Sequence, residues 1–185
     1  MPPKSRRRTV PYPPTLSPTF CDPDPGIPGH RFVLGKLSAS AGRVNPLVVL
    51  GMNPSHADMS ESDDTVNRVA LSSVELGYSG WTILNVYPER ATRPAELMPF
   101  DKELSDLNCV AIERFLTTNR VPEVFGAWGN PPNATIRQAR PEALAVLADL
   151  GVRIFYFGTL TKKKHPRHLR PRGSALDLTA TKSYL

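Results

Sequence analysis

The sequence has few cysteines and no long apolar run. Its 185 residues include only two cysteines, Cys21 and Cys109, and these lack Cys-x-x-Cys spacing, which excludes a disulfide framework and a zinc knuckle. No stretch approaches the roughly 18 consecutive apolar residues of a membrane-spanning helix, and the first residues lack the apolar segment of a signal peptide. We therefore expect a cytoplasmic protein that does not contact a membrane.

Acidic residues are absent from two segments that carry much of the positive charge. The net charge is +6 and the pI about 9.6. Residues 4–8 hold four basic side chains, and residues 162–172 hold Lys162, Lys163, Lys164, Arg167, Arg170 and Arg172. Such clusters are typical of surfaces that bind polyanions, so we expect nucleic acid, with DNA favoured, as the partner. The alternative, a solvated basic tail, fits residues 4–8 better than residues 162–172, because the second segment follows a predicted core strand.

Proline is concentrated at the start of the chain. Residues 1–29 contain a large share of the 20 prolines, which predicts an extended, partly disordered arm without a regular ladder or helix. The remaining residues, 30–185, have the apolar content and length of a single α/β domain with a basic C-terminal segment. We expect a monomer.

Apolar runs alternate with segments of helical periodicity along the rest of the chain. The runs predict strands at 31–34, 47–52, 81–87, 124–128 and 152–157, and the helical spacing predicts helices at 63–77, 101–119 and 142–150. Asp63 or Asp64 can cap the first of these helices, and Pro141 can start the last. This alternation predicts a three-layer α/β sandwich with a mainly parallel central sheet and helices on both faces.

Polar side chains follow several of the predicted strands. Asn53 and Ser55 come after the second strand, Asn85 lies in the third, and His165 lies in the loop after the last. Because ligands bind beyond the carboxyl ends of the strands in open α/β sheets, we expect these four residues around one pocket. Asparagine, proline and serine are also ordinary turn residues, so each segment alone is explained as well by a strand that ends in a loop.

Five short motifs follow one another between residues 30 and 170. They are, in order, Asn53–Asp58, Asp63–Thr65, Asn85 with Arg90–Thr92, Trp128–Gly129 and His165–His168. In this order they resemble the bacterial and phage family named domain of unknown function 1643. The family's name carries no activity.

The segment Gly51–Pro54 is similar to the first motif of uracil-DNA-glycosylase-like enzymes, particularly the mismatch-specific branch. That more distant resemblance implies a uracil-DNA-glycosylase-like version of the α/β sandwich. It also implies that Asn53 positions the attacking water, that Asn85 reads the flipped base, and that His165 opens the last motif, whose loop enters the duplex. Ser55 stands where these enzymes usually have glycine.

Cleavage of an N-glycosidic bond needs little nucleophile strength when the sugar leaves as an oxocarbenium-like species. An asparagine that orients water can then suffice if the departing base is stabilised, and we assign these two roles to Asn53 and His165. The predicted substrate-binding residues are Met52, Pro54, Ser55, Asn85 and Tyr87, and the predicted nucleic-acid-binding residues are Lys162, Lys163, Lys164, Arg167 and Arg170. The expected activity is that of a DNA glycosylase-like hydrolase that uses no metal or other cofactor.

Two alternatives belong to other functional classes. Asp58, Asp63, Asp64 and His56 permit a nucleotide hydrolase with a hard-cation or mixed metal site, and His168 is a possible accessory residue, better explained as a polar loop residue than as a ligand. Asp63 and Asp64 also have an adequate use at the start of the first helix. The other alternative is a catalytically silent nucleic-acid-binding module. Among the aromatic residues, Tyr87 is the candidate for stacking on a base, and Trp81 and Trp128 are predicted to lie in the core.

Overall fold

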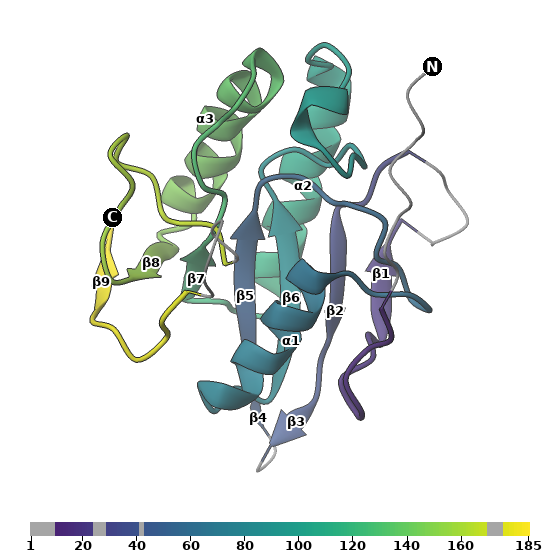
Figure 1. Cartoon of the computed structure of the whole chain (residues 1–185), viewed down its shortest axis with the longest axis vertical. Helices are drawn as coiled ribbons and strands as arrows, with labels where there is room; N and C mark the ends of the chain where they lie inside the picture. The colour runs from purple at the N-terminus through teal and green to yellow at the C-terminus, as the bar shows by residue number, and fades with distance from the viewer. Residues whose placement is uncertain (1–9, 24–28, 41–42, 170–175) are drawn as a thin grey trace.

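The computed structural model describes residues 10–23, 29–40, 43–169 and 176–185. Within them, seven strands form one sheet in the order β1-β2-β6-β5-β7-β8-β9, and β3 pairs separately with β4 (Figure 1). The elements in chain order are β1 (Phe20–Asp22), β2 (Val33–Lys36), β3 (Ala39–Ser40), β4 (Arg43–Val44), β5 (Pro46–Gly51), α1 (Asp64–Glu75), β6 (Gly80–Asn85), the 3-10 helix η1 (Pro94–Glu96), α2 (Lys102–Thr118), β7 (Glu123–Gly126), α3 (Ala134–Asp149), β8 (Arg153–Phe157) and β9 (Lys182–Tyr184).

The sheet is mixed, whereas the sequence analysis predicted a mainly parallel one. Its inner strands β6, β5, β7 and β8 run parallel, and β1, β2 and β9 join it in antiparallel pairs. The inner strands follow one another through α1, α2 and α3, and each of these crossovers returns the chain in the same direction. The outer strands are reached through loops without such a crossover, and the hydrophobic pattern of a strand does not encode its direction.

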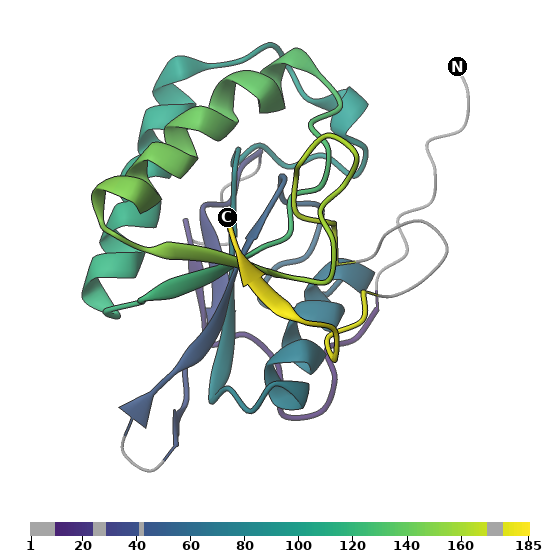
Figure 2. The ribbon, with the colours of Figure 1, turned by 90° about the vertical axis from the view of Figure 1, so that its left-hand side faces the viewer.

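Helices cover both faces of the sheet, as predicted. Figure 2 shows α1 on one side of the strands and α2 with α3 on the other. Side chains of β5 alternate between these faces: Leu47 and Val49 belong to the apolar cluster that includes residues of α1, and Val48 and Leu50 to the cluster that includes residues of α2 and α3. The sheet therefore separates two apolar cores, and its carboxyl edge remains for a site.

Polar side chains begin each helix. Asp63 caps α1, as predicted, because its Oδ1 accepts from the backbone nitrogens of Thr65 and Val66 at 2.9 and 2.8 Å. Asn133 caps α3, which begins at Ala134 and contains Pro141 in its interior. The prediction that Pro141 starts this helix is wrong, because the Asn133 cap sets the start earlier and an internal proline removes one backbone hydrogen bond without ending the helix.

Part of the proline-rich arm pairs with the sheet. Residues Phe20–Asp22 form β1 against β2, although we predicted no regular ladder in residues 1–29; this short stretch contains no proline. Upstream, Val10 and Ser62 exchange backbone hydrogen bonds of 3.2 and 3.0 Å, and the Trp81 indole donates to the Leu16 carbonyl oxygen at 3.0 Å. The arm's residues 1–9 and 24–28 lie outside the described residues.

Neither the helices nor the cysteines of the described chain contradict the predictions made from composition. No helix in these ranges combines the length and the apolar character that crossing a bilayer requires. Both cysteines are free thiols. Burial raises the pKa of the Cys21 and Cys109 thiols, so both are protonated near neutral pH and are poor nucleophiles.

Candidate functional site

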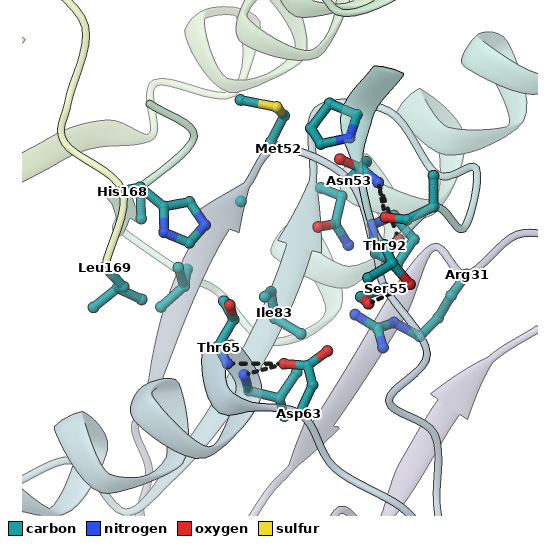
Figure 3. A pocket seen from close by; sticks show the side chains of 18 residues that line it. Arg31, Met52, Asn53, Ser55, Asp63, Thr65, Ile83, Thr92, His168 and Leu169 are labelled. Carbon is teal, nitrogen blue, oxygen red and sulfur yellow. Dashed lines mark hydrogen bonds between the residues drawn. The ribbon is translucent and has the colours of Figure 1, made fainter. Parts of the chain in front are cut away.

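A pocket lies at the carboxyl ends of β5 and β6 (Figure 3). Its volume of about 240 Å³ is below the roughly 300–1,000 Å³ of pockets for drug-sized ligands, so it suits a ligand the size of a single heterocycle. Its lining residues are Arg31, Val49, Gly51, Met52, Asn53, Pro54, Ser55, Asp63, Thr65, Val66, Ile83, Asn85, Ala91, Thr92, Pro94, Ala127, His168 and Leu169. Met52, Pro54, Ser55 and Asn85, which the sequence analysis assigned to substrate binding, are among them.

Asn53 ties the end of β5 to the loop after β6. Its side-chain nitrogen donates to the carbonyl oxygens of Ala91 at 2.9 Å and Pro54 at 3.1 Å, with a longer contact to that of Glu89 at 3.5 Å. These bonds fix the orientation of the amide. Its oxygen accepts no hydrogen bond from the described residues and is the group of Asn53 that can accept from a water molecule or a ligand.

Asn85 places a buried amide in the same pocket. The residue is 1% exposed, and its side-chain nitrogen has no hydrogen-bond partner among the described residues. The side chain of Asn85 lies close to the backbone of Gly51, because a Cβ added to that glycine would be only 3.1 Å from Oδ1 of Asn85. A buried donor without an acceptor is costly, so a ligand acceptor next to Asn85 would stabilise the site.

Hydroxyl groups line the rim beside Asn53. Ser55 Oγ lies 3.5 Å from Oγ1 of Thr92 and 3.2 Å from Nδ1 of His56. Ser55 and Thr92 line the pocket, whereas His56 does not. The hydroxyl groups of the rim can therefore both donate and accept hydrogen bonds.

Two buried charged side chains, those of Arg31 and Asp63, also line the pocket. Arg31 is 1% exposed and lies next to Asp63 in Figure 3. Arg31 donates to the carbonyl oxygen of Ala57 at 2.5 Å, and Arg90 donates to the same oxygen at 3.0 Å, so the two arginines hold the loop after Asn53. Sequence reasoning missed Arg31. Its only signal is a charged residue directly before an apolar strand.

The structure places His168, and not His165, in this pocket. Figure 3 shows His168 and Leu169 on one side, opposite Asn53 and Ser55. The His165 ring instead contacts Nη1 of Arg140 at 3.0 Å. Burial, then the charges of Arg140 and Lys163, lower the pKa of His165, so this imidazole is neutral near neutral pH.

One family match contains the whole of this pocket. The family model described as a protein of unknown function (DUF1643) matches residues 31–169, which is more than half of the chain. The chain belongs to this family. No curated protein and no solved structure matched the chain, so the comparisons give the uracil-DNA-glycosylase resemblance no support.

In this DUF1643 protein the predicted stacking ring lies in the core. Tyr87 is 0% exposed, and its hydroxyl accepts from the backbone nitrogen of Asp101 at 3.1 Å. It does not line the pocket, whose only aromatic ring among the described residues is the imidazole of His168. Trp81 and Trp128 are buried, as predicted. Strand β6 ends at Asn85, two residues before the end of the predicted strand, and the Tyr87 ring belongs to the apolar cluster that includes residues of α2 and α3.

The predicted carboxylate cluster is divided among structural roles. Asp58 Oδ1 accepts from the backbone nitrogens of Ser60 and Glu61 at 2.8 and 2.9 Å, and Asp63 caps α1. Of Asp58, Asp63 and Asp64, only Asp63 lines the pocket. In the part of the chain that the structure describes, no three His, Cys, Asp or Glu residues are grouped so that they could hold a metal ion.

The segment after β8 connects a basic surface to the pocket. We call residues 159–169 the basic loop. Lys162, Lys163 and Lys164 are exposed on it, and Arg167 donates to the carbonyl oxygen of Thr159 at 2.9 Å. The same loop ends at the pocket with His168 and Leu169. Arg170, also predicted to bind nucleic acid, lies outside the described residues.

Proposed function

We propose that this protein hydrolyses the N-glycosidic bond of a base in nucleic acid, with DNA favoured, and that the base enters the pocket. The observation that carries the proposal is the buried amide of Asn85, whose nitrogen lacks a partner in a pocket of heterocycle size. An asparagine amide is a donor and an acceptor side by side, which matches the edge of a nucleobase. A base bound there would satisfy the buried nitrogen.

Asn53 is the residue that orients water in this proposal. Its nitrogen is held by the carbonyl oxygens of Ala91 and Pro54, so its oxygen has a fixed direction. A water molecule that donates to this oxygen can attack the sugar carbon as the glycosidic bond breaks. The bonding electrons pass to the base nitrogen, and the proton that the water loses neutralises the departed base.

The basic loop favours a polynucleotide over a free nucleotide. Three exposed lysines, Lys162, Lys163 and Lys164, lie on the segment whose last residues line the pocket. Phosphates on either side of an extruded nucleotide would contact such a loop while the base occupies the pocket. His165, within this loop, contacts Arg140 and does not line the pocket, so we place the base against His168.

A nucleotide hydrolase with a metal at Asp58, Asp63 and Asp64 is the weaker proposal. Asp58 is engaged in its own loop and Asp63 at the start of α1, so the carboxylates do not converge. The other alternative, a catalytically silent nucleic-acid-binding module, would need no reactive group in the pocket. The fixed orientation of Asn53 and the partnerless nitrogen of Asn85 favour an enzyme over this module.

The test is release of bases from oligonucleotides that carry uracil, mismatched or modified bases, measured as abasic-site formation. We expect wild-type protein to release at least one of them, and Asn53→Ala to lose most of this activity. Ser60→Ala, on the exposed surface outside the pocket, is the control variant. DNA binding without release of any base would favour the silent module. Release that Asp63→Asn and chelator each abolish would favour the metal hydrolase.

A further inference from the structure

Arg31 is a buried cation in the wall of the pocket with an incomplete set of partners. Its Nε is buried and has no hydrogen-bond partner among the described residues. Its one side-chain hydrogen bond in this part of the chain goes to a neutral acceptor, the Ala57 carbonyl oxygen. The ion pairs found between described residues do not include Arg31. A guanidinium removed from water without a bonded carboxylate favours binding of an anion.

A second positive charge lies close to Arg31, because the Arg90 and Arg31 guanidiniums both donate to the Ala57 carbonyl oxygen. Burial, and then repulsion from Arg90, lower the pKa of Arg31 to about 10, and the attraction of Asp63 only partly opposes them. Arg31 nevertheless stays charged at neutral pH. The Asp63 carboxylate attracts Arg31 without bonding to it among the described residues; its Oδ1 accepts instead from two backbone N–H groups at the start of α1.

Asn85 supplies a second donor to the same cavity. Its nitrogen is buried, and it too has no partner within the described ranges. Arg31 and Asn85 come from neighbouring strands, one just before β2 and the other at the end of β6, which pairs with β2. Two buried donors without partners, one of them charged, favour binding of an acceptor that carries negative charge.

We propose that Arg31 and Asn85 form an anion-binding subsite that takes a small acceptor with one negative charge. Two sources share this chemistry: the deprotonated ring of an acidic base, or a free oxyanion such as phosphate. The first rests on the proposed function, because the base leaves with the bonding electrons of the glycosidic bond. Arg31 then stabilises the leaving base, a role that the sequence analysis assigned to His165.

The test compares two ligands of similar shape on the full-length protein. Uracil is neutral near neutral pH, and 5-nitrouracil is an anion there with an absorbance that reports its ionisation. We expect the protein to bind 5-nitrouracil about tenfold more tightly and to lower the pKa of the bound ligand by about one. This spectroscopic titration needs no variant, so it stands even if a change at Arg31 prevents folding. An unchanged or raised ligand pKa overturns the subsite.

Variants separate charge from shape. Arg31→Lys should keep part of the preference for the anion, and Arg31→Gln should bind both ligands equally. If Arg31→Gln folds and keeps the preference, the subsite is wrong. If neither pyrimidine binds, inorganic phosphate decides the subsite separately: binding that Arg31→Gln removes supports it, and no binding of phosphate overturns it. The proposed function is decided apart from this, by abasic-site formation.

Discussion

The side-chain nitrogen of Asn53 donates to the carbonyl oxygen of Ala91 at 2.9 Å. This bond joins the end of β5 to the loop after β6, two segments that face each other across the pocket rim. The residue that we assign to water orientation is thus also a structural link. Changes at this position must be judged by stability as well as by activity.

Asn53→Asp should destabilise the protein more than Asn53→Ala does. The new carboxylate oxygen faces the carbonyl oxygens that now accept from Asn53, whereas alanine only removes the bonds. We expect losses in the free energy of unfolding of about 2 kcal/mol for Asn53→Asp and about 1 kcal/mol for Asn53→Ala, measured by urea denaturation at neutral pH. Equal losses would mean that the amide orientation does not matter for folding.

Asp63→Asn should retain stability and any base-releasing activity. An asparagine caps a helix about as well as an aspartate, so α1 keeps its start, whereas Asp63→Ala should cost about 1 kcal/mol. Thermal unfolding measures the first effect, and abasic-site formation with and without chelator measures the second. Sensitivity to chelator together with inactivity of Asp63→Asn would move the chemistry to the carboxylates.

His168→Ala should reduce base release more than His165→Ala does. His168 lines the pocket, and His165 contacts Arg140 outside it. We expect a loss of about tenfold or more for His168→Ala, the scale of a positioned polar group, and a smaller loss for His165→Ala. The opposite order, at equal folded fraction by circular dichroism, would restore His165 as the residue that stabilises the leaving base.

Polynucleotide binding should depend strongly on salt, and the lysines of the basic loop should carry this dependence. Each lost duplex phosphate contact flattens the log–log slope by roughly 0.9, so replacing Lys162, Lys163 and Lys164 together should reduce it by up to about three such steps. The single variant Lys163→Ala has a matched control in Lys102→Ala, which removes one exposed lysine on α2. Binding that ignores salt in the wild type would contradict this prediction and favour a small nucleotide as the ligand.

Glu123, which accepts hydrogen bonds from Lys182 and Tyr184 of β9, should make the free energy of unfolding depend on pH. Burial alone would raise the pKa of Glu123, but hydrogen bonds from Lys182 and Tyr184 and the nearby charges outweigh it and lower the pKa. The carboxylate therefore stabilises the fold above its ordinary pKa, and this contribution is lost as the pH falls. Glu123→Gln should cost up to about 1 kcal/mol near neutral pH, and this cost should disappear as the pH falls below the ordinary glutamate pKa and through the lowered pKa of Glu123. Glu113→Gln, on the exposed face of α2, should show no such change.

The predicted elements with a periodic apolar pattern are found in the structure. The run at 47–52 corresponds to β5, and the helical spacing at 63–77 corresponds to α1, including its Asp63 cap. Burial of one helix face or of a whole strand imposes these patterns on local sequence. Strands β1 and β9 were missed because each has three residues, too few for a period, and their pairing depends on distant segments.

The candidate site was predicted in part for the same reason. Asn53 and Asn85 lie where parallel strands end, and strand ends are visible in the sequence. Which histidine enters the pocket depends on the path of the basic loop, where His165 and His168 are separated by only two residues. Arg31 was missed because its burial results from the loop that packs over it, and no local pattern indicates a buried charge.

The basic loop sets a physical limit on how far the protein reaches along a strand. Lys164 and His168 are four residues apart, so their backbones are separated by at most about 14 Å. Successive phosphates of one DNA strand are about 3.4 Å apart along the axis, so this span corresponds to roughly four nucleotides. An oligonucleotide of about this length would then already span the distance between Lys164 and the pocket, whereas Lys162 lies two residues further along the loop.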